Sequence, residues 1–174
     1  AVKPLKRDAK NASFMHGKTG LGDYGETIKT PKKKVIKKEA VEAMHEVINK
    51  NAGDIIILAM GPQTNLGALF TKYPEDASKI SAIYYEGGSP YGYKNFKPHI
   101  SFNLSSDPEA FKLVLESGVK LYMVPSETGR KQAHFTEKQV NKLLSINDTG
   151  RFLNTLFQKY WEKNYPDKRI ATND

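Results

Sequence analysis

The chain has 174 residues, 39% hydrophobic and 26% charged, which is typical of soluble globular proteins and enough for one compact domain over residues 1–174. No apolar run approaches the roughly 20 residues of a membrane span, and no apolar segment follows the basic N-terminus, so we expect neither a membrane protein nor a secretory leader. The absence of cysteine excludes disulfides, thiolate catalysis and cysteine-based zinc sites. We therefore expect a cytoplasmic protein.

The net charge of +8 raises the question of a nucleic-acid partner, because clustered Lys and Arg side chains neutralise phosphates. The densest cluster comprises residues 32–34 with Lys37 and Lys38. No aromatic side chains are interleaved with these lysines to stack on bases. We interpret the cluster as a solvated loop and helix start, and we expect no nucleic-acid partner.

The first half of the chain predicts a helix, a strand and a second helix. Apolar residues recur at helical spacing over residues 39–51. The run 55–59 is continuously apolar, as in strands that are covered on both faces. The next helix begins near Thr64 and Asn65, either of which could cap it, and Pro74 stops it.

The alternation continues along the chain. Strands are predicted over residues 80–85 and 121–124. Between them a helix begins with Asp107 as N-cap and Pro108 at the first helical position, and it ends at Gly118. This alternation predicts an α/β fold with a mainly parallel, central sheet and helices on both faces.

Two helices are predicted near the end of the sequence. Thr136 and Gln139 form a capping box for a helix through Leu144. Apolar residues at helical spacing over residues 152–161 predict a long final helix, which we interpret as part of the core.

Ligands of parallel sheets bind outside the carboxyl ends of the strands, so we expect sites in segments 60–65, 86–89 and 125–128. The carbonyls at the strand end near Met60 could face a hard cation, although a capped helix start explains this turn equally well. The loop 16–22 is rich in glycine, but it lacks the Lys-Ser/Thr pair of a phosphate-binding loop.

A third group of polar residues comprises Asn95, Ser101 and Asn103. Their amide and hydroxyl groups are able to hold a polyhydroxylated sugar. If the segment is extended, Ser101 and Asn103 share one face of it. Polar residues are common in loops, so this group alone indicates little.

Together these segments resemble the inosine-uridine-preferring nucleoside hydrolase family over nearly the whole chain. The similar motifs are HG-x-x-G-x-G at 16–22, x-G-P-L-T-N-x at 60–66, M-G-G at 86–88, N-(x)7-N-(x)3-D-P at 95–108, and the segment 169–174, which delivers a late metal-binding aspartate. The resemblance implies an α/β sandwich around a mixed sheet. It also implies an N-glycosidase that converts a small-molecule ribonucleoside into ribose and a free base, and a homodimer or homotetramer.

By this resemblance Ca²⁺ is held by Asp174 and the backbone carbonyl of Met60, and Asp174 also contacts the substrate. His16, Asn95 and Asn103 match sugar-contacting positions. The calcium lowers the pKa of a bound water so that an aspartate can deprotonate it. That aspartate belongs to a D-x-D-x-x-x-D-D motif that is absent from this sequence, so we expect the chain to be part of a longer protein.

Three positions depart from the family pattern. Ser101 stands where glutamate is common, and it brings no negative charge to the oxocarbenium-like state. Glu86 replaces the methionine of M-G-G, and its carboxylate, if it points into the pocket, replaces part of what Ser101 lacks. Asn173 stands where some members carry a histidine proposed to protonate the leaving base, and an amide is no general acid near neutral pH.

Two alternatives stay open. The departures at Ser101 and Asn173 are compatible with a nucleoside- or sugar-binding protein of the same fold that has lost catalysis. The second alternative is a basic nucleic-acid-binding domain, and it predicts an affinity for nucleic acid that falls steeply with salt. The sequence does not distinguish purine from pyrimidine substrates.

Overall fold

The computed structural model describes residues 3–9, 12–18, 20, 32–90, 101–131, 134–154 and 169–171. The chain forms two compact units. The first unit consists of residues 1–10 and 35–127, and the second consists of residues 11–34 and 128–174.

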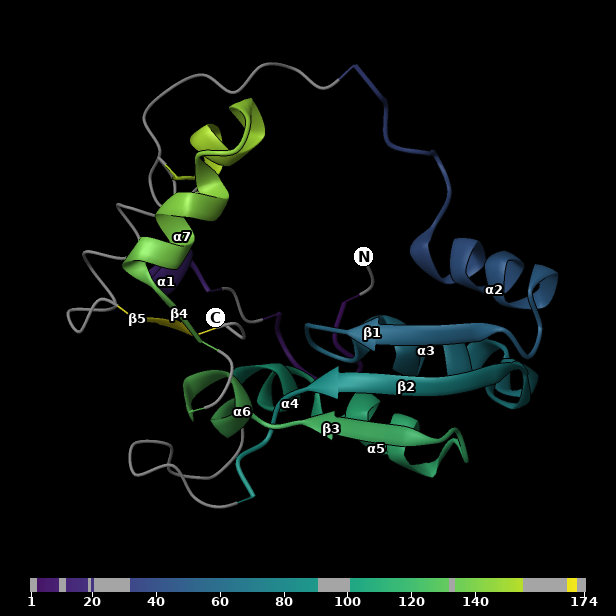
Figure 1. Cartoon of the computed structure of the whole chain (residues 1–174). Coiled ribbons are helices and arrows are strands. Elements are labelled where there is room, and N and C mark those ends of the chain that lie inside the picture. The colour runs from purple at the N-terminus through teal and green to yellow at the C-terminus, as the bar shows by residue number, and fades with distance from the viewer. Residues whose placement is uncertain are drawn as a thin grey trace. The chain divides into compact units, whose positions relative to one another are not determined.

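The first unit is built on a three-stranded sheet of β1 (Ile55–Ala59), β2 (Ile80–Glu86) and β3 (Leu121–Val124), in the order β1-β2-β3. Both pairs are parallel, and the three arrows point the same way in Figure 1. Leu58 pairs with Tyr84, which pairs in turn with Tyr122. The strands predicted from the sequence are therefore confirmed, and β2 extends one residue further, to Glu86.

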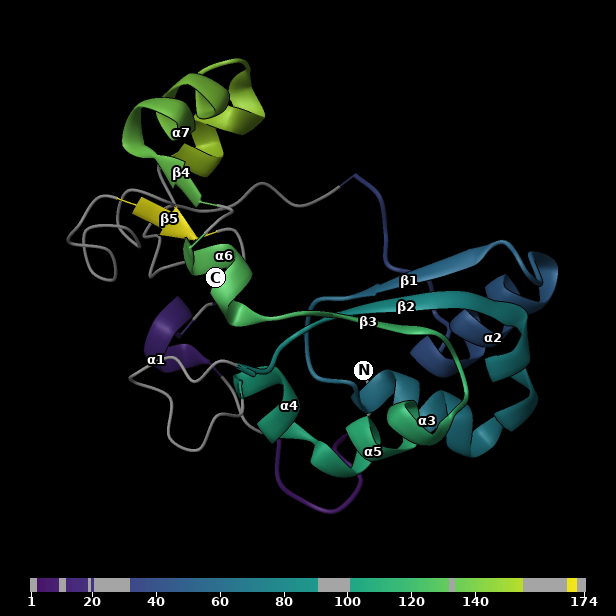
Figure 2. The same ribbon diagram turned by 60° about the horizontal axis from the view of Figure 1, so that its bottom comes forward.

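The helices of this unit are α2 (Ala40–Lys50), α3 (Thr64–Lys72), the 3-10 helix η1 (Pro74–Lys79), α4 (Phe102–Ser106) and α5 (Pro108–Glu116). Crossovers between parallel strands are almost always right-handed, and both crossovers here step in the same direction across the sheet. They therefore carry α3 and α5 to the same face of the sheet. Figure 2 shows that α2 lies on this face as well.

The core of the first unit lies between that face and its helices. Ile83 of β2, Leu69 of α3 and Val114 of α5 are completely buried there. On the opposite face, Ile56 and Leu58 are 59% and 67% exposed, so burial alternates along β1. Within this unit, helices cover one face of the sheet, whereas the apolar run had predicted a strand covered on both.

Local signals explain where α5 begins. The Asp107 carboxylate accepts a hydrogen bond from the backbone N–H of Ala110 at 3.1 Å, and Pro108 occupies the first turn, as predicted. The start of α3 differs from the expectation. Its N-cap is Gln63, which makes no capping hydrogen bond with its side chain, so neither Thr64 nor Asn65 is the cap.

The segment before α5 is helical, so the condition of an extended chain is not met there. Residues 102–106 form the short helix α4, and the Ser101 hydroxyl caps it by accepting from the backbone N–H of Leu104 at 3.5 Å. Ser101 and Asn103 therefore do not share the face of a strand. A cap bond formed within four residues favours a helical turn over extended chain.

The second unit includes α1 (Ser13–His16), β4 (His134–Thr136), α7 (Glu137–Leu144) and β5 (Arg169–Ala171). The two strands are antiparallel. The capping box of Thr136 and Gln139 is present at the start of α7, as predicted. Residues 148–154 are helical, and the remainder of the predicted final helix lies outside the described residues. Over the described ranges, we find no helix with the length and apolarity to cross a membrane.

Helices α3 and α5 approach each other most closely at a glycine. A Cβ atom added at Gly67 would lie 2.5 Å from the Cβ and 2.7 Å from the Cα of Ala110, which is completely buried. Any larger residue at position 67 must push the two helices apart. The small size of both residues thus allows α3 and α5 to pack side by side under the sheet.

We predict that Gly67→Ala destabilises the protein by about 1–3 kcal/mol, because the added methyl group overpacks the crossing with Ala110. The measurement is urea unfolding followed by circular dichroism. The matched control is Gly61→Ala, where an added Cβ meets nothing within 4 Å and the same substitution should change stability little. Equal effects of the two substitutions would contradict the proposed close crossing.

Candidate functional site

A group of polar atoms lies at the carboxyl edge of the sheet. Met60 follows β1, Glu86 is the last residue of β2, and Ser126 follows β3 by two positions. Asn103 reaches the same edge from α4. Because parallel strands end on one side of a sheet, residues far apart in the sequence meet there. We call Met60, Glu86, Asn103 and Ser126 the edge cluster.

Hydrogen bonds connect the members of the edge cluster. The Asn103 side-chain amide donates to Glu86 Oε2 and, at 3.4 Å, to the backbone carbonyl of Met60. The Ser126 hydroxyl donates to the other oxygen, Glu86 Oε1, at 3.5 Å. Both oxygens of the half-buried Glu86 carboxylate are thus engaged by neighbours at this edge.

The turn after β2 holds Glu86 close to β3. Gly87 N donates to the carbonyl of Val124 at 3.1 Å, and Ser126 N donates to the carbonyl of Gly88 at 3.1 Å. Gly87 has a φ of 144°, and a Cβ there would lie 2.6 Å from the Ser101 hydroxyl oxygen. This position therefore requires glycine both for its backbone conformation and for the space that Ser101 occupies.

Ser101 itself is 9% exposed, and its hydroxyl caps α4. It lies against Gly87 and supports the helix that carries Asn103. Ser101 therefore acts on the edge cluster indirectly, by capping the helix that carries Asn103.

A buried pair beside the edge cluster was not singled out from the sequence. The Ser89 hydroxyl donates to Glu127 Oε1 at 2.6 Å, and the two residues are 7% and 6% exposed. An acidic residue within the segment 125–128, just after a strand, was the only signal that could have indicated Glu127. The pair links the turn after β2 to the start of α6 (Ser126–Lys131).

The remaining predicted site residues are His16, Asn95, Asn173 and Asp174. His16 is the last residue of α1 in the second unit, where it is half-buried and is followed by Gly17 at a φ of 74°. Asn95, Asn173 and Asp174 lie outside the described residues.

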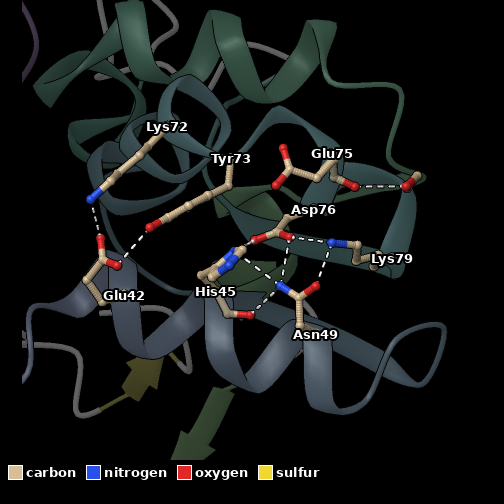
Figure 3. Close-up of polar contacts among 9 residues, drawn as sticks. Glu42, His45, Asn49, Lys72, Tyr73, Glu75, Asp76 and Lys79 are labelled. Carbon is tan, nitrogen blue, oxygen red and sulfur yellow. Dashed lines mark hydrogen bonds and ion pairs between the residues drawn. The ribbon is translucent and has the colours of Figure 1, made fainter.

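A second group of ionisable side chains lies at the amino end of β2, on η1 and α2. The possible metal-ligating atoms of His45, Glu75 and Asp76 are all within 4.8 Å of one another. Asp76 is completely buried and accepts hydrogen bonds from His45 Nδ1 at 2.7 Å, Asn49 Nδ2 at 3.1 Å and Lys79 Nζ at 3.0 Å (Figure 3). By position, this group could hold a metal ion.

The charges of this group favour a structural interpretation. The Lys79 ammonium group already lies next to the Asp76 carboxylate, and a metal ion there would be repelled by it. The His45 ring stacks on Tyr73 with ring centroids 3.7 Å apart, and the Tyr73 hydroxyl donates to Glu42 at 2.8 Å. The network therefore joins α2 to the end of α3 and to η1, as Figure 3 shows.

Two opposing effects act on the pKa of Asp76. Burial raises the pKa, while hydrogen bonds from His45, Lys79 and Asn49 lower it, and the net pKa lies below the ordinary value of 3.8. The carboxylate is therefore stabilised in its ionised form inside the fold.

A known protein family matches this chain over its full length. The family model described as inosine-uridine preferring nucleoside hydrolase matches residues 1–174. The chain belongs to this family. The resemblance found in the sequence motifs is thereby confirmed.

Among similar proteins, the non-specific ribonucleoside hydrolase RihC of Salmonella paratyphi B is 34% identical over 160 residues, which cover 92% of this chain and 51% of that protein. The chain thus spans about half the length of such relatives. A purine-preferring ribonucleoside hydrolase from Gardnerella vaginalis has the same fold, with a TM-score of 0.81 and 24% identity over 98% of this chain and 56% of that one. The plant nucleoside hydrolase PpNRh1 gives a TM-score of 0.76 and 28% identity over 93% of this chain and 51% of that one.

We predict that Asp76→Asn destabilises the protein at neutral pH by about 1.5–3 kcal/mol, because it weakens hydrogen bonds to a charged acceptor. Since the folded pKa is lowered, the stabilisation is fully present above the ordinary value of 3.8 and is lost as the pH falls through the folded pKa. The difference between wild type and variant should therefore shrink below about pH 4. The measurement is chemical unfolding as a function of pH.

The control for this prediction is Asp148→Asn, since the Asp148 side chain is 97% exposed and a surface ion pair contributes little. If the free energies of unfolding of wild type and Asp76→Asn differ by the same amount from neutral to acid pH, ionisation of Asp76 does not stabilise the fold.

Proposed function

We propose that the protein to which this chain belongs hydrolyses the N-glycosidic bond of ribonucleosides, releasing ribose and a free nucleobase. The observation that carries the proposal is the edge cluster, because it gathers a carboxylate, an amide, a hydroxyl and a backbone carbonyl where ligands of parallel sheets bind. Such groups suit a polyhydroxylated ligand. The family membership of the chain supports the same reaction.

In this proposal Asn103, together with His16 and Asn95, holds the ribose through its hydroxyl groups. Ser101 contributes through α4, which it caps. Glu86 places a negative charge at the edge of the site, and a negative charge stabilises the positive charge that develops on the sugar in the oxocarbenium-like transition state. Hydrogen bonds to ribose that strengthen in that state lower the barrier further.

We propose that the metal of this site is Ca²⁺, held by Asp174 and the backbone carbonyl of Met60, with further carboxylates from outside this sequence. The oxygen atoms at the edge suit a hard cation, because the Met60 carbonyl and the Glu86 carboxylate are the kinds of ligand that such a cation prefers. When bound, the ion supplies an activated water. The group of His45, Glu75 and Asp76 fits calcium less well, since it offers an imidazole nitrogen and contains a lysine ammonium group.

Protonation of the leaving base is assigned to a group other than Asn173. An amide can donate a hydrogen bond to the base, but it cannot transfer a proton near neutral pH. With an asparagine at position 173, we expect turnover to be best for nucleosides whose bases leave readily. The same residue supports a second candidate function, a nucleoside-binding protein without catalysis.

The absence of cysteine supports a cytoplasmic location, and the family resemblance supports a homodimer or homotetramer.

The experiment measures ribose release from inosine, uridine, adenosine and cytidine by the full-length protein, with calcium and with a chelator. We expect release only with calcium. Asp174→Ala should reduce it by on the order of a hundredfold or more, because metal stabilisation of transition-state charge is worth several kcal/mol.

The control variant is Asp148→Ala, which removes an exposed carboxylate far from the edge cluster in sequence. It should retain wild-type turnover. Nucleoside binding without ribose release would overturn the hydrolase and support the binding protein. If the protein neither binds nucleosides nor releases ribose, both candidate functions are overturned.

A further inference from the structure

We infer that Glu86 is a positioning residue that fixes the orientation of the Asn103 amide, so that Asn103 offers a bound ribonucleoside only its carbonyl oxygen. The inference rests on the proposed function for the identity of the ligand. It assigns Glu86 a task besides supplying charge, and it predicts a chemical preference of the site.

The neighbours of Asn103 determine which way its amide faces. Glu86 Oε2 and the Met60 carbonyl are both acceptors, and both lie next to the same nitrogen, Asn103 Nδ2. With the amide turned around, its oxygen would face two other oxygens without a proton between them. An amide has two N–H donors, and these two acceptors use both.

Glu86 is the stronger of the two anchors. A hydrogen bond to an ionised carboxylate is roughly twice as strong as one between neutral groups, and the bond to the Met60 carbonyl is long, at 3.4 Å. Met60 alone therefore holds the amide weakly. The choice of orientation depends on Glu86.

Glu86 is itself held from two directions. Its other oxygen accepts a long bond of 3.5 Å from the Ser126 hydroxyl, and its backbone, which is the firmer restraint, is paired with Val124 in β3. The next residue, Gly87, donates to the Val124 carbonyl at 3.1 Å. A half-buried carboxylate fixed in this way can impose an orientation on a neighbouring side chain.

One polar atom of the Asn103 amide is left to contact a ligand. With both N–H groups engaged, Asn103 interacts with a ligand through Oδ1, which is an acceptor. The ligand group that contacts it must then donate a hydrogen bond. A ribose hydroxyl does so, whereas a fluorine atom in the same place is similar in size and cannot.

Two variants at position 86 separate orientation from charge. Glu86→Gln keeps an acceptor for Asn103, and its new amide nitrogen faces the Ser126 hydroxyl oxygen, which can accept. Orientation is therefore retained without the charge. Glu86→Met removes the side-chain acceptor at position 86, so the Asn103 amide keeps only its long bond to the Met60 carbonyl and can rotate.

The first measurement follows the side-chain amide of Asn103 by NMR in full-length protein labelled with ¹⁵N-asparagine, with the resonance assigned by its loss in Asn103→Gln. We expect protected, hydrogen-bonded amide protons in wild type and Glu86→Gln, and rapidly exchanging ones in Glu86→Met. An unchanged resonance in Glu86→Met would overturn the inference. This readout does not depend on activity.

The second measurement compares dissociation constants for inosine and its 2′-, 3′- and 5′-fluoro analogues by calorimetry, because fluorine next to the reacting carbon also slows the chemistry. For the hydroxyl that contacts Asn103, we expect fluorine to weaken binding about tenfold in wild type and Glu86→Gln. In Glu86→Met the loss should fall to about twofold, because the amide can then turn its N–H toward the ligand.

Equal discrimination against the fluoro analogues in all three proteins would overturn the inference. If wild type binds no nucleoside at all, the proposed function fails instead, and the amide resonance still decides the role of Glu86. The two failures are therefore distinguishable.

Discussion

Parallel pairing of β1, β2 and β3 governs how the first unit is arranged. It sends both crossovers over the same face, so α3 and α5 must pack next to each other, and the contact between Gly67 and Ala110 makes this possible. It also brings the carboxyl ends of the strands to one edge. The edge cluster exists because of this second consequence.

The two ends of the sheet have different kinds of polar network. At the amino end of β2, Asp76 is buried and bonded to side chains from α2 and η1, so its network contributes to stability. At the carboxyl edge, Glu86 and Asn103 are hydrogen-bonded to each other and only half-buried, so they remain partly exposed to solvent. A carboxylate at each end thus contributes in a different way.

Much of the fold could be predicted from local signals. Asp107 with Pro108 indicated the start of α5, and Thr136 with Gln139 indicated the start of α7, because capping bonds form between residues three apart. The short helix α4 was missed, since five residues are too few to establish helical periodicity. The strands β4 and β5 were missed for the same reason, with three residues each.

The family, the order of the motifs and the acidic residue at position 86 follow from the sequence alone. The direction in which the Glu86 carboxylate points depends on contacts that exist only in the folded chain. Its partners Asn103 and Ser126 are 17 and 40 residues away, so no local pattern could reveal them. Strand pairing and the capped turn of α4 bring them together, and these long-range contacts turn an unusual residue in a motif into part of a candidate site.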